Sequence, residues 1–88
     1  MEFQKGPGRV FALGEDGSLL AEITFPVQGG VAVIDHTFVH ESLRGQGVAG
    51  RLMEEAVACI RRQGLKAKPV CSYAISWLEK HPEHRDLL

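Results

Sequence analysis

The hydrophobic pattern of this chain changes its period near the middle, and that change limits the folds open to it. Apolar and polar residues alternate over short runs such as Leu19–Phe25 (LLAEITF), whereas from Val48 to Gln63 the apolar residues recur three and four positions apart. Alternation is typical of a strand with one buried face, and the longer spacing is typical of a helix. The chain therefore combines a sheet with helices.

Three strands are expected in the first half, at Arg9–Leu13, Leu19–Phe25 and Val31–Val39. The first two are separated by residues 14–17, which end in Asp-Gly, a strong turn signal. Residues 26–30 begin with proline and end with two glycines, which favour a second turn. Tight turns between consecutive strands predict an antiparallel meander.

The second half predicts a helix, a short strand and a second helix. The helix Val48–Gln63 has one apolar stripe and is followed by Gly64, a residue suited to ending it. The strand Leu65–Cys71 contains a proline, which indicates an edge or a bulge. Ser72 is expected to cap the last helix, Tyr73–Lys80.

The element order is thus β-β-β-α-β-α, which predicts an α+β fold with two helices packed on a mostly antiparallel sheet. Because a helix lies between Val31–Val39 and Leu65–Cys71, these two strands are expected to run parallel. Eighty-eight residues hold one core, so residues 1–88 are expected to form a single domain.

Charge and composition narrow the classes of partner. The net charge is −1 and the basic residues are scattered, so no nucleic-acid footprint is expected. No apolar run reaches the length of about 18 residues that spans a membrane, and Met1–Lys5 does not resemble a signal peptide. Cys59 and Cys71 are expected to be free thiols. These features predict a protein of the cytoplasm without nucleic-acid or membrane partners.

Four histidines and two cysteines raise the question of a metal site. His36 and His40 have the same parity on one strand, and His81 and His84 are three residues apart. No pair shows the close spacing of C-x-x-C or H-E-x-x-H. No metal is expected.

The most specific motif lies between the third strand and the long helix, at residues 44–50: Arg44, Gly45, Gln46, Gly47, Val48, Ala49 and Gly50. The first turn of a helix carries N–H groups without intrahelical partners, and the helix dipole adds positive potential. Glycines beside these donors let a phosphate approach the backbone. A diphosphate would receive several N–H bonds there, with Arg44 and Arg51 as candidates to assist.

Other interpretations of this motif explain less. A tight turn alone accounts for the glycines but not for the arginine. Residues 45–50 also match G-x-G-x-x-G, yet Leu65–Val70 lacks the acidic residue that would hold a ribose, and the chain is too short for a Rossmann domain. A Walker loop would need Gly-Lys-Ser/Thr, which is absent.

The pattern R-x-x-G-x-A, formed by Arg44, Gly47 and Ala49 after an apolar strand, resembles the acetyl-CoA signature Q/R-x-x-G-x-G/A of the GNAT acetyltransferase superfamily. Residues 35–39 (DHTFV), 71–73 (CSY) and 80–83 (KHPE) resemble the short, single-domain YjdJ-like group of GNAT-like proteins and its vertebrate relatives. The resemblance extends from about Leu19 to Glu83.

This resemblance implies a minimal GNAT domain that binds acetyl-CoA and transfers its acetyl group to an amine. It implies that the strand before the loop diverges from the strand after the helix, and that the pantetheine arm pairs with strand backbone at Phe38 and Val39. One departure concerns the acceptor. Full-length relatives carry two helices between the first strands, where this chain has only Glu15–Ser18. The identity of the amine is therefore left open.

Three side chains are candidates for the chemistry. Cys71 precedes a helix, which favours its thiolate, so it either carries an acetyl group or only lines the pocket. Tyr73 either donates a proton to the leaving sulfur, as a tyrosine does in many GNAT enzymes, or packs as an ordinary aromatic. His36 either acts as the general base or is a structural histidine. Glu22 is a weaker candidate for the base.

Two further functions compete with N-acetyl transfer. The chain can be a non-catalytic module that binds or senses acyl-CoA, as the missing acceptor-site helices suggest. It can also be a small interaction domain that keeps the loop for folding alone. Binding of coenzyme A separates the third hypothesis from the first two, and turnover separates the first from the second.

Overall fold

The computed structural model describes all 88 residues, as seven strands, two α-helices and two short 3-10 helices. In chain order these are β1 (Gln4–Gly6), β2 (Arg9–Leu13), β3 (Leu19–Thr24), β4 (Val27–Gln28), β5 (Val31–Ile34), β6 (His36–Val39), η1 (Glu41–Leu43), α1 (Val48–Arg62), β7 (Lys66–Pro69), α2 (Ser72–Glu79) and η2 (Pro82–Leu87). The predicted α+β fold class is confirmed.

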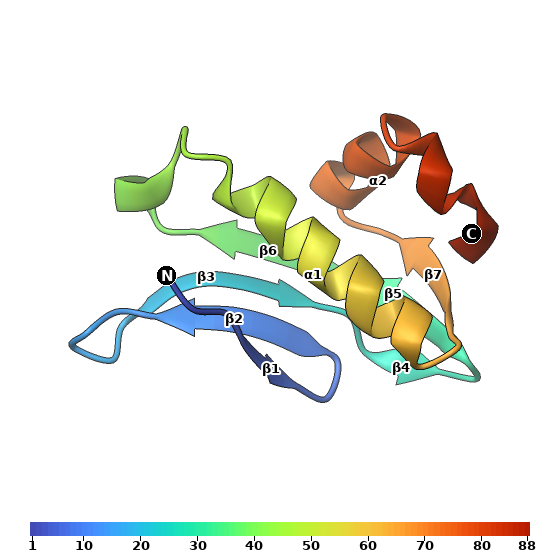
Figure 1. Cartoon of the computed structure of the whole chain (residues 1–88), viewed down its shortest axis with the longest axis horizontal. Helices are drawn as coiled ribbons and strands as arrows, with labels where there is room; N and C mark the ends of the chain where they lie inside the picture. The colour runs from blue at the N-terminus through green and yellow to red at the C-terminus, as the bar shows by residue number, and fades with distance from the viewer.

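The strands form two small sheets with no strand in common (Figure 1). One sheet has the order β1-β2-β3-β6 and is antiparallel throughout. The other has the order β4-β5-β7, with β5 and β7 parallel, as the helical crossover predicts. Since β6 pairs only with β3, and β7 only with β5, β6 and β7 diverge beyond Ile34 and leave one edge of β6 open.

The single strand predicted at Val31–Val39 is wrong, because a bulge at Asp35 divides it into β5 and β6. Thr24 opposes two residues here: its carbonyl accepts from the N–H of Asp35 over 3.2 Å, and it is also in register with His36. Its hydroxyl holds the Asp35 carboxylate over 2.5 Å. An extra residue bends a strand and increases its twist, which turns β6 away from β7.

The core lies between α1 and the sheets. Its largest fully buried side chains come from β2, β3, β5, α1 and the residue that follows β3, and they are Phe25, Ile23, Ile34, Leu52, Met53, Ile60 and Val10. The predicted apolar stripe of α1 is therefore confirmed. Figure 1 shows α1 crossing one face of the β1-β2-β3-β6 sheet, while no helix covers the opposite face.

Several predicted boundaries differ from those observed. Strand β1 was not predicted from the sequence, and neither was β4, because Val27–Gln28 lies inside the segment expected to be a turn. The strand at Leu65–Cys71 is shorter, and only Lys66–Pro69 pairs with β5. Cys71, not Ser72, caps α2: its sulfur accepts from the N–H of Ala74 over 3.4 Å. Neither α-helix is long and apolar enough to cross a membrane.

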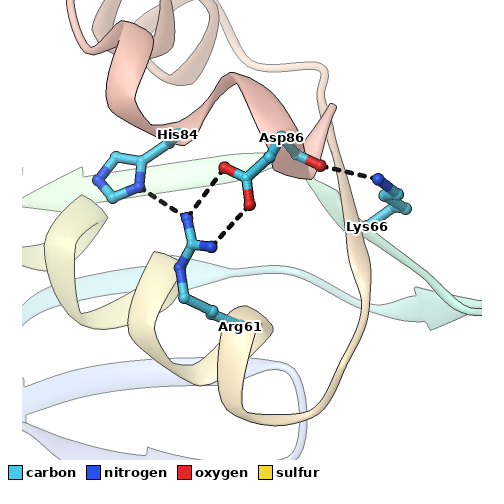
Figure 2. A network of polar contacts seen from close by, with 4 residues as sticks. All are labelled: Arg61, Lys66, His84 and Asp86. Carbon is cyan, nitrogen blue, oxygen red and sulfur yellow. Dashed lines mark hydrogen bonds and ion pairs between the residues drawn. The ribbon is translucent and has the colours of Figure 1, made fainter.

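The C-terminal turn is held to the body of the molecule by a polar network (Figure 2). Arg61 of α1 donates to both carboxylate oxygens of Asp86, over 2.7 and 3.3 Å, and lies 3.1 Å from Nδ1 of His84. Lys66 of β7 donates to the carbonyl of Asp86 over 2.7 Å. The network closes η2 over the end of α1 and seats Leu87 in the core.

This network predicts a pH dependence of stability. Hydrogen bonding from Arg61 lowers the pKa of Asp86 below its ordinary 3.8. A carboxyl with a lower pKa in the folded state stabilises the fold above its unfolded pKa, and this contribution is lost as the pH falls through the folded value. We expect Asp86→Asn to lose less stability than the wild type between about pH 6 and about pH 3, measured by urea unfolding. Arg61→Gln should flatten the same limb and add nothing to Asp86→Asn. An unchanged acid limb in both variants would contradict the assignment.

Candidate diphosphate-binding turn

The backbone N–H groups of residues 45–50 have no hydrogen-bond partner within the protein. The first donor of the α1 turn that finds an acceptor is Arg51, which donates to the carbonyl of Gly47 over 3.2 Å. No side chain caps the helix. A row of unpaired donors at the positive end of a 15-residue helix is an anion-binding arrangement.

Gly47 directly precedes α1 as its N-cap, in a left-handed conformation with φ of 75° and ψ of 15°. Gly45 is also left-handed, with φ of 82°. A Cβ built on either residue would meet no atom within 4 Å, so the backbone there is bare. The glycines therefore have two effects: they allow the turn that aims the donors, and they keep side chains away from them.

A cavity of about 170 Å³ opens at this turn. It is lined by the end of β6, the loop, the first turn of α1 and one residue of α2: Val39, Leu43, Arg44, Gly45, Gly47, Val48, Ala49, Gly50 and Tyr73. The predicted loop thus forms most of a real concavity. Leu43 was not predicted from the sequence, although an isolated apolar residue in a polar loop is a signal for inward packing.

The polar side chains of the loop differ in what they do. Arg44 is exposed, and its Nε lies 3.5 Å from the carbonyl of Val39, which places the guanidinium at the mouth of the cavity. Gln46 donates from its side chain to the carbonyl of Ser42 over 3.3 Å, so it stabilises the loop. Arg51, by contrast, lies over the ring of Phe3 at 5.0 Å from its centroid.

The two residues expected to pair with the pantetheine arm are placed differently. Val39 lines the cavity, whereas Phe38 does not. In β6 the backbone of Phe38 is in register with Glu22, and the N–H of His40 donates to the carbonyl of Leu20 over 2.7 Å. Because alternate residues of an edge strand direct their backbone groups outward, Val39 and not Phe38 faces the open edge with its N–H and with the carbonyl that Arg44 contacts.

Tyr73 and Cys71 both belong to the start of α2. The hydroxyl of Tyr73 lies 3.8 Å from the position that a Cβ on Gly50 would occupy, and burial raises the pKa of this phenol. Tyr73 therefore keeps its proton at neutral pH. Cys71 is half-buried and free, and its N–H donates to the carbonyl of Ile34 over 3.2 Å. The thiol thus lies where β7 leaves β5.

His36 is separate from this cavity. It begins β6 at the bulge, exposed on the sheet face that no helix covers, with Nε2 4.0 Å from a carboxylate oxygen of Glu22. Glu22 is in turn hydrogen-bonded to Nε of Arg9. The structure therefore brings Tyr73 to the predicted loop, puts Cys71 next to the bulge, and leaves His36 at the far end of β6.

A larger cavity, of about 420 Å³, lies between β7, α2 and the C-terminal residues. Its lining is Pro69, Ile75, Leu78, Glu79, Pro82, Arg85 and Leu88. None of these residues was predicted to bind a ligand. No group of three His, Cys, Asp or Glu side chains in the molecule is arranged to hold a metal ion.

Comparison with known proteins identifies a family whose match includes the turn at residues 45–50. Residues 10–87 match the family model for GCN5-related N-acetyltransferases. A GCN5-like protein from Staphylococcus aureus, with a solution structure, is 34% identical, has a TM-score of 0.79, and is matched over 98% of this chain and 85% of its own. A search of curated proteins found no match.

More distant structures share the fold alone. Tetrahymena GCN5 is 17% identical with a TM-score of 0.66, matched over 82% of this chain and 48% of its own. Ard1 from Thermoplasma volcanium is 21% identical with a TM-score of 0.65, matched over 84% and 53%. The chain thus spans about half the length of these larger proteins. The family match covers nearly all of this chain, including α2 and the turn of unpaired N–H donors at residues 45–50, which we call the donor turn. This chain belongs to the GCN5-related N-acetyltransferase family.

Proposed function

We propose that this protein binds acetyl-CoA and transfers its acetyl group to an amine. The observation that carries the proposal is the row of unpaired N–H groups at residues 45–50, open to a glycine-lined cavity. Such donors suit the two adjacent phosphates of coenzyme A, and the arginine at the mouth adds charge-assisted hydrogen bonds. Membership of an acetyltransferase family supports the same cosubstrate.

The rest of the cosubstrate has a matching surface. From the donor turn, the open edge of β6 leads back toward the bulge at Asp35, about 3.3 Å per residue. Val39 offers outward backbone groups on this edge, and an amide-containing arm can pair with them as another strand would. The acetyl end would then lie in the gap where β6 and β7 diverge, beside Cys71.

The proposed reaction is direct transfer. The amine, once it has given up its ammonium proton to a base, attacks the thioester carbonyl; a C–N bond forms and the C–S bond breaks. The departing sulfur takes a proton, leaving coenzyme A and an acetylated amine. We assign the proton donor to Tyr73, since it lines the same cavity as Val39, along the proposed path of the arm. Burial raises the pKa of its phenol, so the hydroxyl holds its proton at neutral pH.

We assign the base to His36. Its imidazole lies at the bulge and is exposed to an approaching amine. Glu22 lies within 4.0 Å of Nε2 and can stabilise the imidazolium that forms on proton transfer.

Two measurements test the proposal. In an NMR titration, acetyl-CoA should shift the amides of residues 45–50 more than those of the opposite end of α1. In a thiol assay, coenzyme A should be released faster when an amine from a panel of polyamines, peptides and aminoglycosides is added. Absence of any shift at residues 45–50 up to millimolar acetyl-CoA would refute the proposal.

Removal of the Tyr73 hydroxyl is expected to slow transfer more than binding. A positioned general acid contributes roughly 10²–10⁴-fold, so Tyr73→Phe should lower kcat by about two orders of magnitude. The alkaline fall in rate, where the phenol loses its proton, should disappear. Ser76→Ala on α2 is the matched control and should leave kcat unchanged. An unaltered pH profile in Tyr73→Phe would assign the proton donor elsewhere.

A second function is favoured by one observation: only residues 14–18 join β2 and β3, with no helix beside them to form an acceptor site. A non-catalytic module that binds or senses acyl-CoA would look the same. Mass spectrometry after mixing with acetyl-CoA distinguishes the two. Turnover without an adduct indicates direct transfer, and one added acetyl group on Cys71, absent in Cys71→Ala, indicates covalent transfer through the thiol. Binding with neither adduct nor turnover indicates a sensor.

A further inference from the structure

Gly50 lies in a helix, at a position where the backbone conformation does not require glycine. It is the third residue of α1, and it is absent from the seven glycines that have positive φ. Glycine inside a helix destabilises it by about 0.5–1 kcal/mol relative to alanine. Gly50 also lies outside the R-x-x-G-x-A pattern, so its presence calls for another explanation.

The space beside Gly50 is bounded by two hydrogen-bond donors from α2. A Cβ on Gly50 would lie 3.8 Å from Nε1 of Trp77 and 3.8 Å from the hydroxyl of Tyr73, and would meet nothing closer. We call this space, between Gly50, the Tyr73 hydroxyl and Trp77 Nε1, the notch. It adjoins the cavity at the donor turn, since Gly50 and Tyr73 line both.

Trp77 is an unpartnered donor that faces the notch. The residue is only 8% exposed, yet no group of the protein accepts a hydrogen bond from its indole N–H. Every side-chain nitrogen or oxygen that is fully enclosed in this protein has a hydrogen-bond partner. Since Nε1 of Trp77 has none, it is not fully enclosed. The indole N–H is therefore open to solvent at the notch, and it is free to donate to a ligand atom that takes the place of water.

The orientation of the indole is set from its other side. The ring of His81 stacks on it at 3.7 Å between centroids with 13° between planes, and the His81 Nδ1 lies 2.7 Å from the Trp77 carbonyl. His84 stacks at 5.7 Å and is itself held by Arg61. The indole N–H therefore keeps its direction before any ligand binds, which lowers the entropic cost of binding.

We infer that the notch binds a hydrogen-bond-accepting oxygen of the acyl-CoA, with Trp77 Nε1 as donor and Gly50 as the residue that leaves room. The inference rests on the proposed function. The oxygen belongs either to the diphosphate or to the adjoining part of the pantetheine arm, both of which carry such acceptors. Trp77 is then a binding residue, and the Tyr73 hydroxyl lies beside it on the α2 side of the notch.

The chain offers a direct probe because Trp77 is its single tryptophan. Its indole N–H gives one resolved cross-peak in a ¹⁵N–¹H spectrum. On titration with coenzyme A, this peak is expected to move downfield with the same dissociation constant as the amides of residues 45–50. If those amides shift while the indole peak stays still, the notch is refuted and the proposed function is not. If neither shifts, the proposed function fails as well.

Two variants complete the test. Trp77→Phe keeps an aromatic ring for the stack and removes the donor, and it should weaken coenzyme A binding by about 3–10-fold, the range for one hydrogen bond. Gly50→Ala should raise the melting temperature, because alanine favours the helix, while its methyl group fills the notch and weakens binding by at least about 10-fold. Stability and affinity thus change in opposite directions. Gly50→Ala with unchanged affinity would overturn the inference.

A fragment identifies which oxygen is bound. Adenosine 3′-phosphate 5′-diphosphate carries the diphosphate but lacks the arm. If Trp77→Phe weakens both this fragment and coenzyme A, the acceptor is a phosphate oxygen; if it weakens coenzyme A alone, the acceptor lies on the arm. Either result supports the notch. Equal affinities of Trp77→Phe and the wild type for both compounds would exclude it.

Discussion

Replacing Ala49 with aspartate is expected to reduce acetyl-CoA binding by roughly two orders of magnitude or more. Ala49 is the second residue of α1 and lines the cavity at the donor turn. A carboxylate there would face the diphosphate, and two unit charges about 4 Å apart repel by about 4 kcal/mol at an effective dielectric constant near 20. The same carboxylate would also occupy the N–H groups that the phosphates need. Isothermal titration calorimetry measures the loss.

The charge effect can be separated from the size effect with Ala49→Asn, because asparagine has nearly the same volume as aspartate and no charge. We expect the asparagine variant to bind within about 10-fold of the wild type. Ala49→Asp should meanwhile be as stable as the wild type or more so, since an acidic residue in the first turn favours a helix by about 0.3–1 kcal/mol. Equal affinities of the two variants would mean that no anion binds at this turn.

Replacing Phe25 with alanine should unfold a large fraction of the protein at 37 °C. Phe25 follows β3, is 1% exposed, and is the largest fully buried side chain. Its N–H donates to the carbonyl of Gly8 over 2.7 Å, so it also fixes the chain between β3 and β4. Truncating a buried phenylalanine costs about 3–5 kcal/mol, which corresponds to a fall in Tm of roughly 15–30 °C for a domain of this size.

The matched control is Phe11→Ala. Phe11 lies on β2, on the sheet face without a helix, where the guanidinium of Arg9 covers its ring at 3.7 Å. Because this ring is only half-buried, its removal should lower Tm by less than half as much as Phe25→Ala. Circular dichroism on heating gives both values. A larger effect at Phe11 would mean that the open face is buried in solution, for example against another molecule.

Features that depend on neighbours in the chain were accessible from the sequence. Helix α1, its apolar stripe and the glycine turn before it are such features, because capping, dipole and periodicity act over a few residues. The parallel pairing of β7 with β5 also followed from the helix between them. Local geometry placed Arg44 among the residues of interest, whereas Val39 and Tyr73 came from the resemblance to the GNAT superfamily. The structure brings all three to one cavity.

The bulge at Asp35 could not be predicted from the sequence, although it changes the course of β6. A β-branched run such as Val31–Val39 predicts one straight strand, and the interruption depends on Thr24, eleven residues away, which binds both the backbone and the side chain of Asp35. Pairing partners across a sheet depend on the whole fold, so local propensity could not reveal them.

The sequence alone thus determined the donor turn, since unpaired N–H groups and bare glycines at the start of a helix follow from local backbone geometry. Only the tertiary structure decided what faces that turn. The indole N–H of Trp77 meets Gly50 because α2 packs against α1, and β6 separates from β7 because one residue too many opposes Thr24. Both are contacts between segments distant in the chain, and packing of the complete core sets their distances.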